Sequence, residues 1–202
     1  MIIYLHGFNS GGQSQKAAWL RARLAPIVVF APTYAAHRGH DAVRALRKFI
    51  ARLRRENPQD PKLMLIGSSL GGFWAQYLAK NWKNRGQIPG SDPDFSMVLI
   101  NPSLRPDETL ARHVGRYRNE ATGGETVLTA VDVAGLRHYR VEPCDPDVPT
   151  LVLLDDADGV LDYRVAEAAF RGCGRTLVYP GGSHRFEHLS EALPEILALY
   201  RG

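Results

Sequence analysis

Ser69 has the surroundings of a reactive nucleophile. It is the centre of a Gly-x-Ser-x-Gly pattern that runs from Gly67 to Gly71. Because these two glycines have no Cβ atoms, a strand and a helix could meet closely enough there to hold the serine in a strained, exposed turn. The first turn of such a helix would also place free backbone N–H groups beside the serine oxygen, where negative charge would develop during attack on a carbonyl. The pattern therefore predicts a nucleophile elbow.

The residues on both sides of the pattern support this interpretation. Residues 62–66 are mostly apolar and predict a short buried strand. After the serine, apolar and aromatic side chains recur at helical spacing, at Leu70, Phe73, Trp74 and Tyr77. Gly-x-Ser-x-Gly alone is a common accident, but a strand, a turn and a helix in this order favour catalysis over a plain glycine-rich turn.

A serine hydroxyl reacts only when a base takes its proton, so a histidine is needed near Ser69. Ligands of parallel sheets bind beyond the carboxyl ends of the strands, and His184 follows the last predicted strand through a glycine-rich loop. We therefore predict that His184 is the base. His188 is expected to be a surface residue at the start of the terminal helix, while His113 and His138 lack a strand to position them.

The base in turn needs a carboxylate that orients it. Asp155, Asp156 and Asp158 all follow the fifth predicted strand. Asp155 and Asp156 fit the ordinary role of aspartate in a turn. Asp158 lies farther into the loop, where it could reach a histidine across the sheet. Asp158 is therefore the predicted acid, and Asp156 is the alternative.

The developing oxyanion needs two backbone donors. One is expected to be the amide of Leu70, directly after the nucleophile. The second is expected from the loop after the first strand, residues 6–9, with the Phe8 amide as the best candidate.

Strand-like and helix-like segments alternate along the chain, which predicts right-handed crossovers and a mainly parallel sheet covered by helices on both faces. The six strands are expected at residues 2–6, 27–31, 62–66, 96–100, 150–154 and 176–179. Pro194 leaves the start of the terminal helix open. Residues 103–148 are polar and weakly periodic, so we expect them to leave the sheet as a lid or specificity element within a single α/β domain spanning residues 1–202.

The bulk composition is that of an ordinary globular protein. Of its 202 residues, 45% are hydrophobic and 23% are charged, and the net charge is +4. The basic residues of segment 44–55 are expected to form the solvated face of one helix, so nucleic acid is not predicted as a partner. No stretch approaches the roughly 20 apolar residues needed to span a bilayer, so a membrane is not predicted as a partner either. The N-terminus lacks the features of a signal peptide, which predicts a cytoplasmic protein, and two reduced thiols are expected at Cys144 and Cys173.

Two other ligand-binding motifs are weaker. Residues 7–14 nearly match a phosphate-binding P-loop, but Gln13 stands where the loop needs a lysine. His37, His40 and Asp41 could be imagined as a metal site, although Asp41 is more simply a cap for the following helix. No metal or organic cofactor is predicted.

Taken together, these segments resemble an α/β-hydrolase, and more narrowly the UPF0227 (YqiA-like) family of small bacterial esterases. The matching motifs are YLHGFNS (residues 4–10), GSSLGG (67–72), NP and RP (101–102 and 105–106), DGVLDY (158–163) and GGSHRF (181–186). The resemblance implies the triad Ser69, Asp158 and His184, in agreement with the residues themselves. It also implies that the first strand corresponds to the third strand of larger relatives. Family members tend to carry Tyr-Thr-Gly where this chain has Ala-Thr-Gly at 121–123, so their substrate preference is not carried over.

The sequence therefore predicts a serine hydrolase of small carboxylic esters, with thioesters as a further substrate class, which acts through an acyl-enzyme. The alternative is a catalytically inactive protein of the same fold that binds a small ligand or a protein partner. Acyl length, physiological substrate and oligomeric state stay open.

Overall fold

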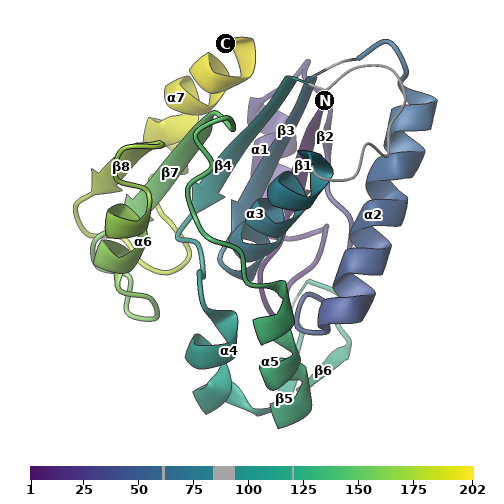
Figure 1. Cartoon of the computed structure of the whole chain (residues 1–202), viewed down its shortest axis with the longest axis vertical. Helices are drawn as coiled ribbons and strands as arrows, with labels where there is room; N and C mark the ends of the chain where they lie inside the picture. Colours follow the sequence, from purple (N-terminus) through teal and green to yellow (C-terminus); the bar gives the residue numbers. More distant parts are fainter. Residues whose placement is uncertain (61, 84–93, 120) are drawn as a thin grey trace.

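A six-stranded parallel sheet forms the centre of the molecule (Figure 1). The computed structural model describes residues 1–60, 62–83, 94–119 and 121–202. Along the sheet the strand order is β2-β1-β3-β4-β7-β8, and each neighbouring pair is parallel. The strands are β1 (Ile2–Leu5), β2 (Val29–Phe30), β3 (Lys62–Ser68), β4 (Asp94–Ile100), β7 (Thr150–Asp155) and β8 (Arg175–Tyr179). The predicted α/β class and the six strands are confirmed.

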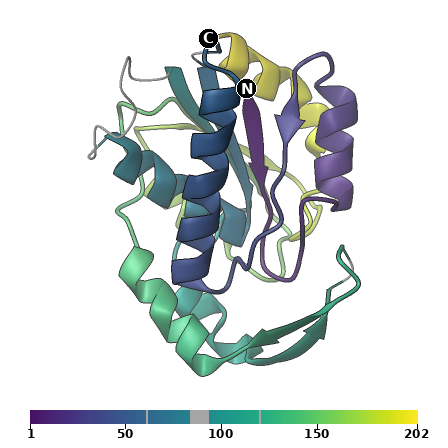
Figure 2. The same ribbon diagram turned by 90° about the vertical axis from the view of Figure 1, so that its right-hand side faces the viewer.

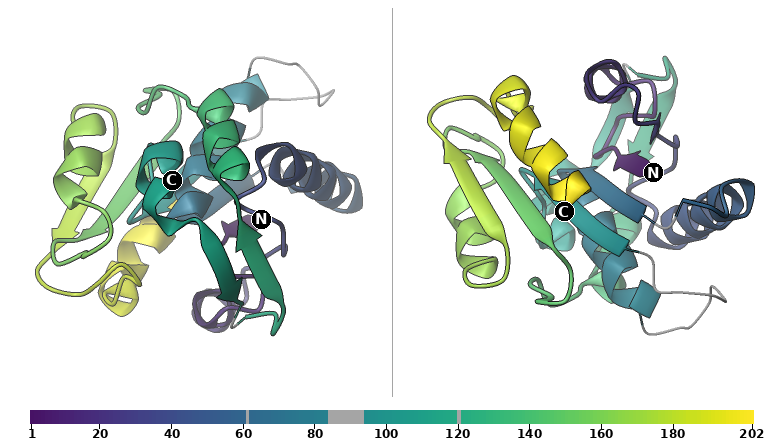
Figure 3. Two further views of the ribbon diagram at one scale, coloured as in Figure 1. Left: turned by 90° about the horizontal axis from the view of Figure 1, so that it is seen from below. Right: turned by 90° about the horizontal axis from the view of Figure 1, so that it is seen from above.

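Helices cover both faces of this sheet, as the buried strands require. Successive strand side chains point to opposite faces, so Ile3 and Leu5 pack on one side, and Ile2 and Tyr4 on the other. The first side is covered by α2 (Gly39–Glu56), α3 (Leu70–Lys83) and α6 (Tyr163–Ala169). The second is covered by α1 (Gln15–Arg23) and α7 (Leu189–Arg201), as Figure 3 shows from above.

The starts of two helices bear on the sequence predictions. The terminal helix begins at Leu189 and runs through Pro194, because its buried residues Ala192 and Ile196 hold it against the sheet. Asp41 was wrongly expected to cap α2. The N-cap residue is Arg38, and Asp41 lies in the first helical turn, where its carboxylate pairs with Arg44 at 3.0 Å.

Residues 103–148 leave the sheet after β4 and return at β7. They form the helices α4 (Pro106–Thr109), η1 (Ala111–His113), α5 (Ala130–Leu136) and η2 (Arg137–Tyr139), and an antiparallel hairpin of β5 (Gly115–Arg118) and β6 (Glu125–Leu128). Figures 1 and 2 show these elements beyond the carboxyl ends of the sheet strands. Arg140 joins the two ends of the segment, since its guanidinium donates to both carboxylate oxygens of Asp107 at 2.7 and 2.6 Å. We call this segment the cap.

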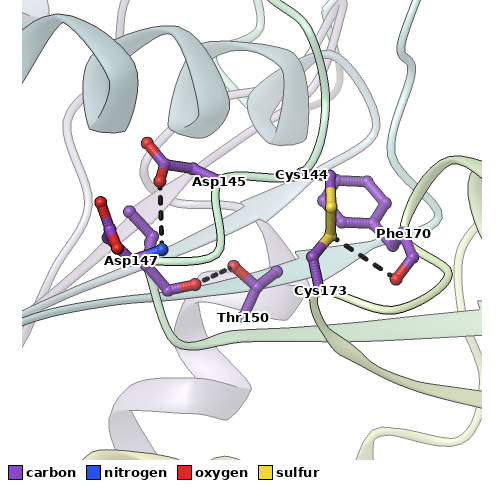
Figure 4. The surroundings of a disulfide bond; sticks show 7 residues. Cys144, Asp145, Asp147, Thr150, Phe170 and Cys173 are labelled. Atoms are coloured by element: carbon purple, nitrogen blue, oxygen red, sulfur yellow. Dashed lines mark hydrogen bonds between the residues drawn. A yellow bond between two sulfur atoms is a disulfide. The ribbon is translucent and has the colours of Figure 1, made fainter.

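Cys144 and Cys173 form a disulfide, so the expectation of two reduced thiols was wrong (Figure 4). Cys144 lies ahead of β7, and Cys173 lies just ahead of β8. Because β7 and β8 are adjacent and parallel, both cysteines come to the amino end of the sheet, with their Cα atoms 5.6 Å apart. A separation of 29 residues carries no signal of this pairing in the sequence.

We expect the double variant Cys144→Ser/Cys173→Ser to lose about 2–4 kcal/mol in the free energy of unfolding, because the unfolded chain is no longer cross-linked. Denaturant unfolding of both proteins, with and without a reducing agent, measures this. The reducing agent should destabilise the original protein and leave the double variant unchanged. Since disulfides are rare in reducing compartments, this result also bears on the expected cytoplasmic location. Two titratable thiols in protein unfolded without reducing agent would contradict the pairing.

Within the described ranges, no helix is long and apolar enough to cross a membrane.

Candidate active site

The turn between β3 and α3 has the geometry of a nucleophile elbow. Ser69 has a backbone φ of +54°, in the left-handed region that side-chain-bearing residues rarely adopt. A Cβ atom on Gly67 would lie 2.4 Å from the carbonyl oxygen of Gly71, and one on Gly71 would lie 2.0 Å from that of Leu5. Neither distance is sterically allowed, so both glycines of the pattern are required by the close approach of strand and helix.

Neighbouring backbone holds this strained turn in place. The N–H group of Ser69 donates to the carbonyl oxygen of Ile100 at 2.9 Å. The carbonyl oxygen of Ser69 accepts from the N–H groups of Gly72 at 2.9 Å and Ser103 at 3.1 Å. The elbow is therefore tied to the end of β4 and to the first residue of the cap.

Ser69, His184 and Asp158 lie in one chain of hydrogen bonds. The Nε2 atom of His184 is 2.9 Å from Ser69 Oγ, and its Nδ1 atom is 2.8 Å from Asp158 Oδ2. An ionised carboxylate can only accept, so Nδ1 of a neutral imidazole carries the proton, and Nε2 accepts from the serine hydroxyl. The structure thus brings together the three side chains that were predicted from the sequence.

The environment of Asp158 keeps it ionised. Its side chain is almost fully buried, which alone would raise the pKa of the carboxyl. The opposing hydrogen bonds outweigh burial: His184 donates to Oδ2, while the amides of Val160 and Leu161 donate to Oδ1 at 2.8 and 3.0 Å. Together they hold the pKa of Asp158 below its ordinary value. Asp156, the alternative acid, instead accepts from the amide of Gly181 at 2.7 Å.

Asp155 and His188 form a second acid–histidine pair beside the first. Asp155 is fully buried, and its Oδ1 atom lies 2.7 Å from His188 Nδ1. Its Oδ2 atom accepts from the amides of Ser183 at 3.1 Å and Glu187 at 2.9 Å. Asp155 therefore holds the loop on both sides of His184. The hydrogen bond to Asp155 raises the pKa of His188 above its ordinary value.

The expectation that His188 is a surface residue was wrong. Its side chain is only 17% exposed, and the ring stacks on Tyr179 with a centroid distance of 5.1 Å. Asn101 entered the sequence predictions only as part of the family motif at 101–102, and its contacts with the histidine loop were missed. Its Oδ1 atom accepts from the amide of Asp155 at 3.0 Å, and its Nδ2 atom donates to Ser183 O at 3.0 Å. A buried polar residue at the carboxyl end of a strand was the available signal.

The loop after β1 lies directly against the elbow. A Cβ atom on Gly7 would be 3.1 Å from the Cβ atom of Ser69. Across the described parts of the chain, neither the Phe8 amide nor the Leu70 amide donates a hydrogen bond to a protein acceptor. Both predicted oxyanion donors are therefore free to bind a ligand atom near Ser69. The cap supports this loop, because Asn9 Nδ2 donates to Arg118 O at 3.0 Å.

His6 holds the start of the loop after β1, and its side chain is neutral. Burial lowers the pKa of His6 to about 4. Its Nε2 atom accepts from the amide of Tyr34 at 3.3 Å, which leaves the proton on Nδ1, 2.8 Å from the carbonyl oxygen of Gly7. The Tyr34 hydroxyl in turn donates to the carbonyl oxygen of His6 at 2.8 Å.

His6 should therefore make the protein sensitive to acid. Its pKa is lower in the folded protein than in the unfolded chain, so its contribution is complete above about pH 6.5 and is lost as the pH falls toward 4, by up to about 3 kcal/mol. The measurement is the difference in unfolding free energy between the original protein and His6→Asn from pH 4 to 8. This difference should shrink at acid pH. A difference that does not vary with pH would show that His6 titrates normally.

A cavity of about 660 Å³ opens beside the elbow. Ser69 and His184 lie in its wall, together with Lys16 and Trp19 from α1. Ala121 of the cap also lines it, so the segment in which the chain departs from the resembled family borders this space. The arrangement places a serine hydroxyl and an imidazole at the wall of an open cavity, with the two backbone N–H groups of the predicted oxyanion donors nearby.

The residues of the imagined metal site do not come together. The side chain of His40 is 80% exposed and lies 3.8 Å from Asp41. Among the residues that the structure describes, no three His, Cys, Asp or Glu side chains are grouped so that they could hold a metal ion.

The sequence matches one family model over nearly its whole length. The model of the uncharacterised protein family UPF0227 covers residues 1–201. A UPF0227 protein of Shewanella sp. (strain MR-4) is 26% identical over 204 residues and covers 100% of both chains. A UPF0227 protein of Serratia proteamaculans (strain 568) is 28% identical over 203 residues, covering 98% of this chain and 97% of the relative.

Solved structures share the fold. Est1E from Butyrivibrio proteoclasticus, with bound ferulic acid, superposes with a TM-score of 0.71 at 18% identity, covering 98% of this chain and 88% of that one. An alpha/beta superfamily hydrolase from Oenococcus oeni PSU-1 superposes with a TM-score of 0.69 at 13% identity, covering 100% and 92%. At these identities the likeness shows the α/β-hydrolase fold.

Proposed function

Because the chain belongs to the UPF0227 family and has the α/β-hydrolase fold, we propose that it is a serine hydrolase that cleaves carboxylic esters through Ser69, His184 and Asp158. The family was predicted correctly from the sequence motifs. Its description names no activity, so the proposal depends on the site. The observation that carries it is the continuous chain of hydrogen bonds from Asp158 through His184 to Ser69, at the wall of an accessible cavity.

In the first half-reaction, Ser69 Oγ attacks the carbonyl carbon of the ester while His184 Nε2 takes the hydroxyl proton. The carbonyl oxygen becomes an oxyanion, to which the amides of Phe8 and Leu70 donate. When the tetrahedral intermediate collapses, the bond to the alcohol oxygen breaks. The alcohol leaves with the proton from His184, and the acyl group stays on Ser69.

In the second half-reaction, water takes the place of the alcohol. His184 removes a proton from the water as its oxygen attacks the acyl carbon, and then returns this proton to Ser69 Oγ as the acid leaves. One ester and one water become one acid and one alcohol. These steps use only groups of this chain and a water molecule.

Asp158 acts on both half-reactions through His184. Its ionised carboxylate holds Nδ1 protonated, so Nε2 faces Ser69 as a base. It also stabilises the imidazolium that forms in each transition state. The buried position of Asp158 strengthens this interaction, because charges attract more strongly where water is excluded.

The test is hydrolysis of p-nitrophenyl esters with acyl chains from C2 to C12, alongside a matching series of acyl-CoA thioesters. We expect turnover of at least the short esters, and the same groups can act on a thioester carbonyl. The ratio of kcat/KM between esters and thioesters of the same acyl length shows which of the two classes the protein prefers. A folded protein that turns over neither series would favour the inactive alternative, a binding protein of the same fold.

A further inference from the structure

Lys16 projects into the same cavity as the proposed catalytic residues. It belongs to the first turn of α1, and its side chain lines the cavity together with Ser69 and His184. The ammonium donates a hydrogen bond to the carbonyl oxygen of Arg185, next to His184, and lies 5.9 Å from the centroid of the Phe186 ring. A cationic group is thus placed beside the reaction centre, although the mechanism does not use it.

Among the described residues, no acidic side chain forms an ion pair with this ammonium. Burial lowers the pKa of Lys16 to about 8, so the side chain is still mainly protonated at neutral pH. Asp155 is the acid that acts on it electrostatically, but both carboxylate oxygens of Asp155 are already bonded to the histidine loop.

An ammonium has three N–H donors, and Arg185 O accepts from one of them. Its remaining donors are available to water or to an anionic group in the cavity that Lys16 lines. Arg185 and Glu187 are both exposed, and they add one positive and one negative side chain to the lining. Lys16 therefore leaves the space beside Ser69 with a net positive charge, which favours an anionic occupant.

We infer that Lys16 binds a carboxylate of the substrate, so that the ester cleaved at Ser69 carries a second, ionised acid group. This inference rests on the proposed esterase function and adds a substrate class to it. One ammonium supplies a single positive charge, which matches the single negative charge of a carboxylate. The apolar rings of Phe8 and Trp19 in the same cavity would contact the carbon chain between the two groups.

The kinetic test compares esters of equal shape and different charge. Monoethyl succinate carries the carboxylate on its acyl side, and its neutral partner of the same shape is ethyl 4-methylpentanoate. 3-Carboxypropyl butyrate carries the carboxylate on its alcohol side, and its neutral partner is 4-methylpentyl butyrate. We expect kcat/KM of one charged ester to exceed that of its neutral partner. In Lys16→Met, kcat/KM for this charged ester should fall about 10- to 100-fold.

The loss of kcat/KM in Lys16→Met should be larger for the charged esters than for the neutral ones, and Lys16→Arg should retain most of the charged preference. Lys48→Met is the matched control, because Lys48 is an exposed lysine of α2 outside the cavity lining. Equal loss for charged and neutral esters in Lys16→Met, or equal loss in Lys48→Met, would overturn the inference while the esterase proposal stood.

A binding measurement separates this inference from the failure of the proposed function. Calorimetric titration of Ser69→Ala with each charged ester needs no turnover, and we expect binding to weaken about 10- to 100-fold in Ser69→Ala/Lys16→Met. Weak binding that does not depend on Lys16 would overturn the carboxylate site. Lys16-dependent binding without turnover in the original protein would retain the carboxylate site and contradict the esterase.

Discussion

Replacing Ser69 with alanine is expected to lower kcat for ester hydrolysis by about 10⁴- to 10⁶-fold, because the acyl-enzyme can no longer form. His184→Gln should fall in the same range, since without the base the hydroxyl keeps its proton. The two losses should not add, because a nucleophile and its base act as one unit. Initial rates with p-nitrophenyl acetate, measured on the original protein and on both single and double variants, test this expectation.

The adjacent serine gives a matched control for this experiment. Ser68 is the last residue of β3, and it is buried rather than turned into the elbow. Ser68→Ala should retain activity within about tenfold of the original, since it removes a hydroxyl without touching the hydrogen-bonded chain. If Ser69→Ala kept more than a tenth of the activity, the nucleophile would have to lie elsewhere.

Asp158→Asn is expected to lower kcat by about 10⁴-fold while the fold stays intact. An amide can donate as well as accept, so it can turn its NH₂ group toward His184 Nδ1 and move the ring proton to Nε2. The imidazole then presents a donor to Ser69 and cannot act as its base. Initial rates with p-nitrophenyl acetate on the variant and on the original protein measure this loss.

Asp156→Asn is the control for this replacement. Asp156 carries the same charge two residues earlier, but it bonds to the amide of Gly181 instead of His184. We expect Asp156→Asn to change kcat by less than about tenfold. Near-full activity in Asp158→Asn together with a large loss in Asp156→Asn would move the role of the acid to Asp156.

The meeting of Ser69, Asp158 and His184 could be predicted from the sequence because each of them follows a strand. A strand of apolar residues is readable from composition, and parallel strands bring their carboxyl ends to one edge. Ser69, Asp158 and His184 therefore meet although up to 115 residues separate them. The need for glycine at positions 67 and 71 could also be predicted, because the motif requires strand and helix backbones to approach too closely for a side chain.

The hydrogen bonds that hold the loops around the site could not be predicted in the same way. The bond between Asp155 and His188, and the bonds of Asn101 to the histidine loop, depend on which loops face each other across the sheet. A single sequence contains no period or spacing that encodes this. The disulfide between Cys144 and Cys173 has the same origin, because strand order alone makes the two loops neighbours.

The cap was the least predictable part. Its hairpin and its short helices bury few residues, so their apolar periodicity is weak, and the sequence indicated only a departure from the sheet. Its position became clear from contacts with distant segments. Asn119 Nδ2 donates to Ser10 O at 3.1 Å, and Ala121 borders the cavity. Whether the cap moves as a lid stays a prediction.

Covalent labelling with a fluorophosphonate tests the central claim most directly. The serine oxygen displaces fluoride from phosphorus, and the product resembles the tetrahedral intermediate, so labelling reports the activated nucleophile without a chosen substrate. Intact-mass and peptide mass spectrometry should find one phosphonyl group, located on Ser69. The label should be absent from Ser69→Ala and present in Ser68→Ala. A folded protein that never takes the label, or takes it at another residue, would contradict the account.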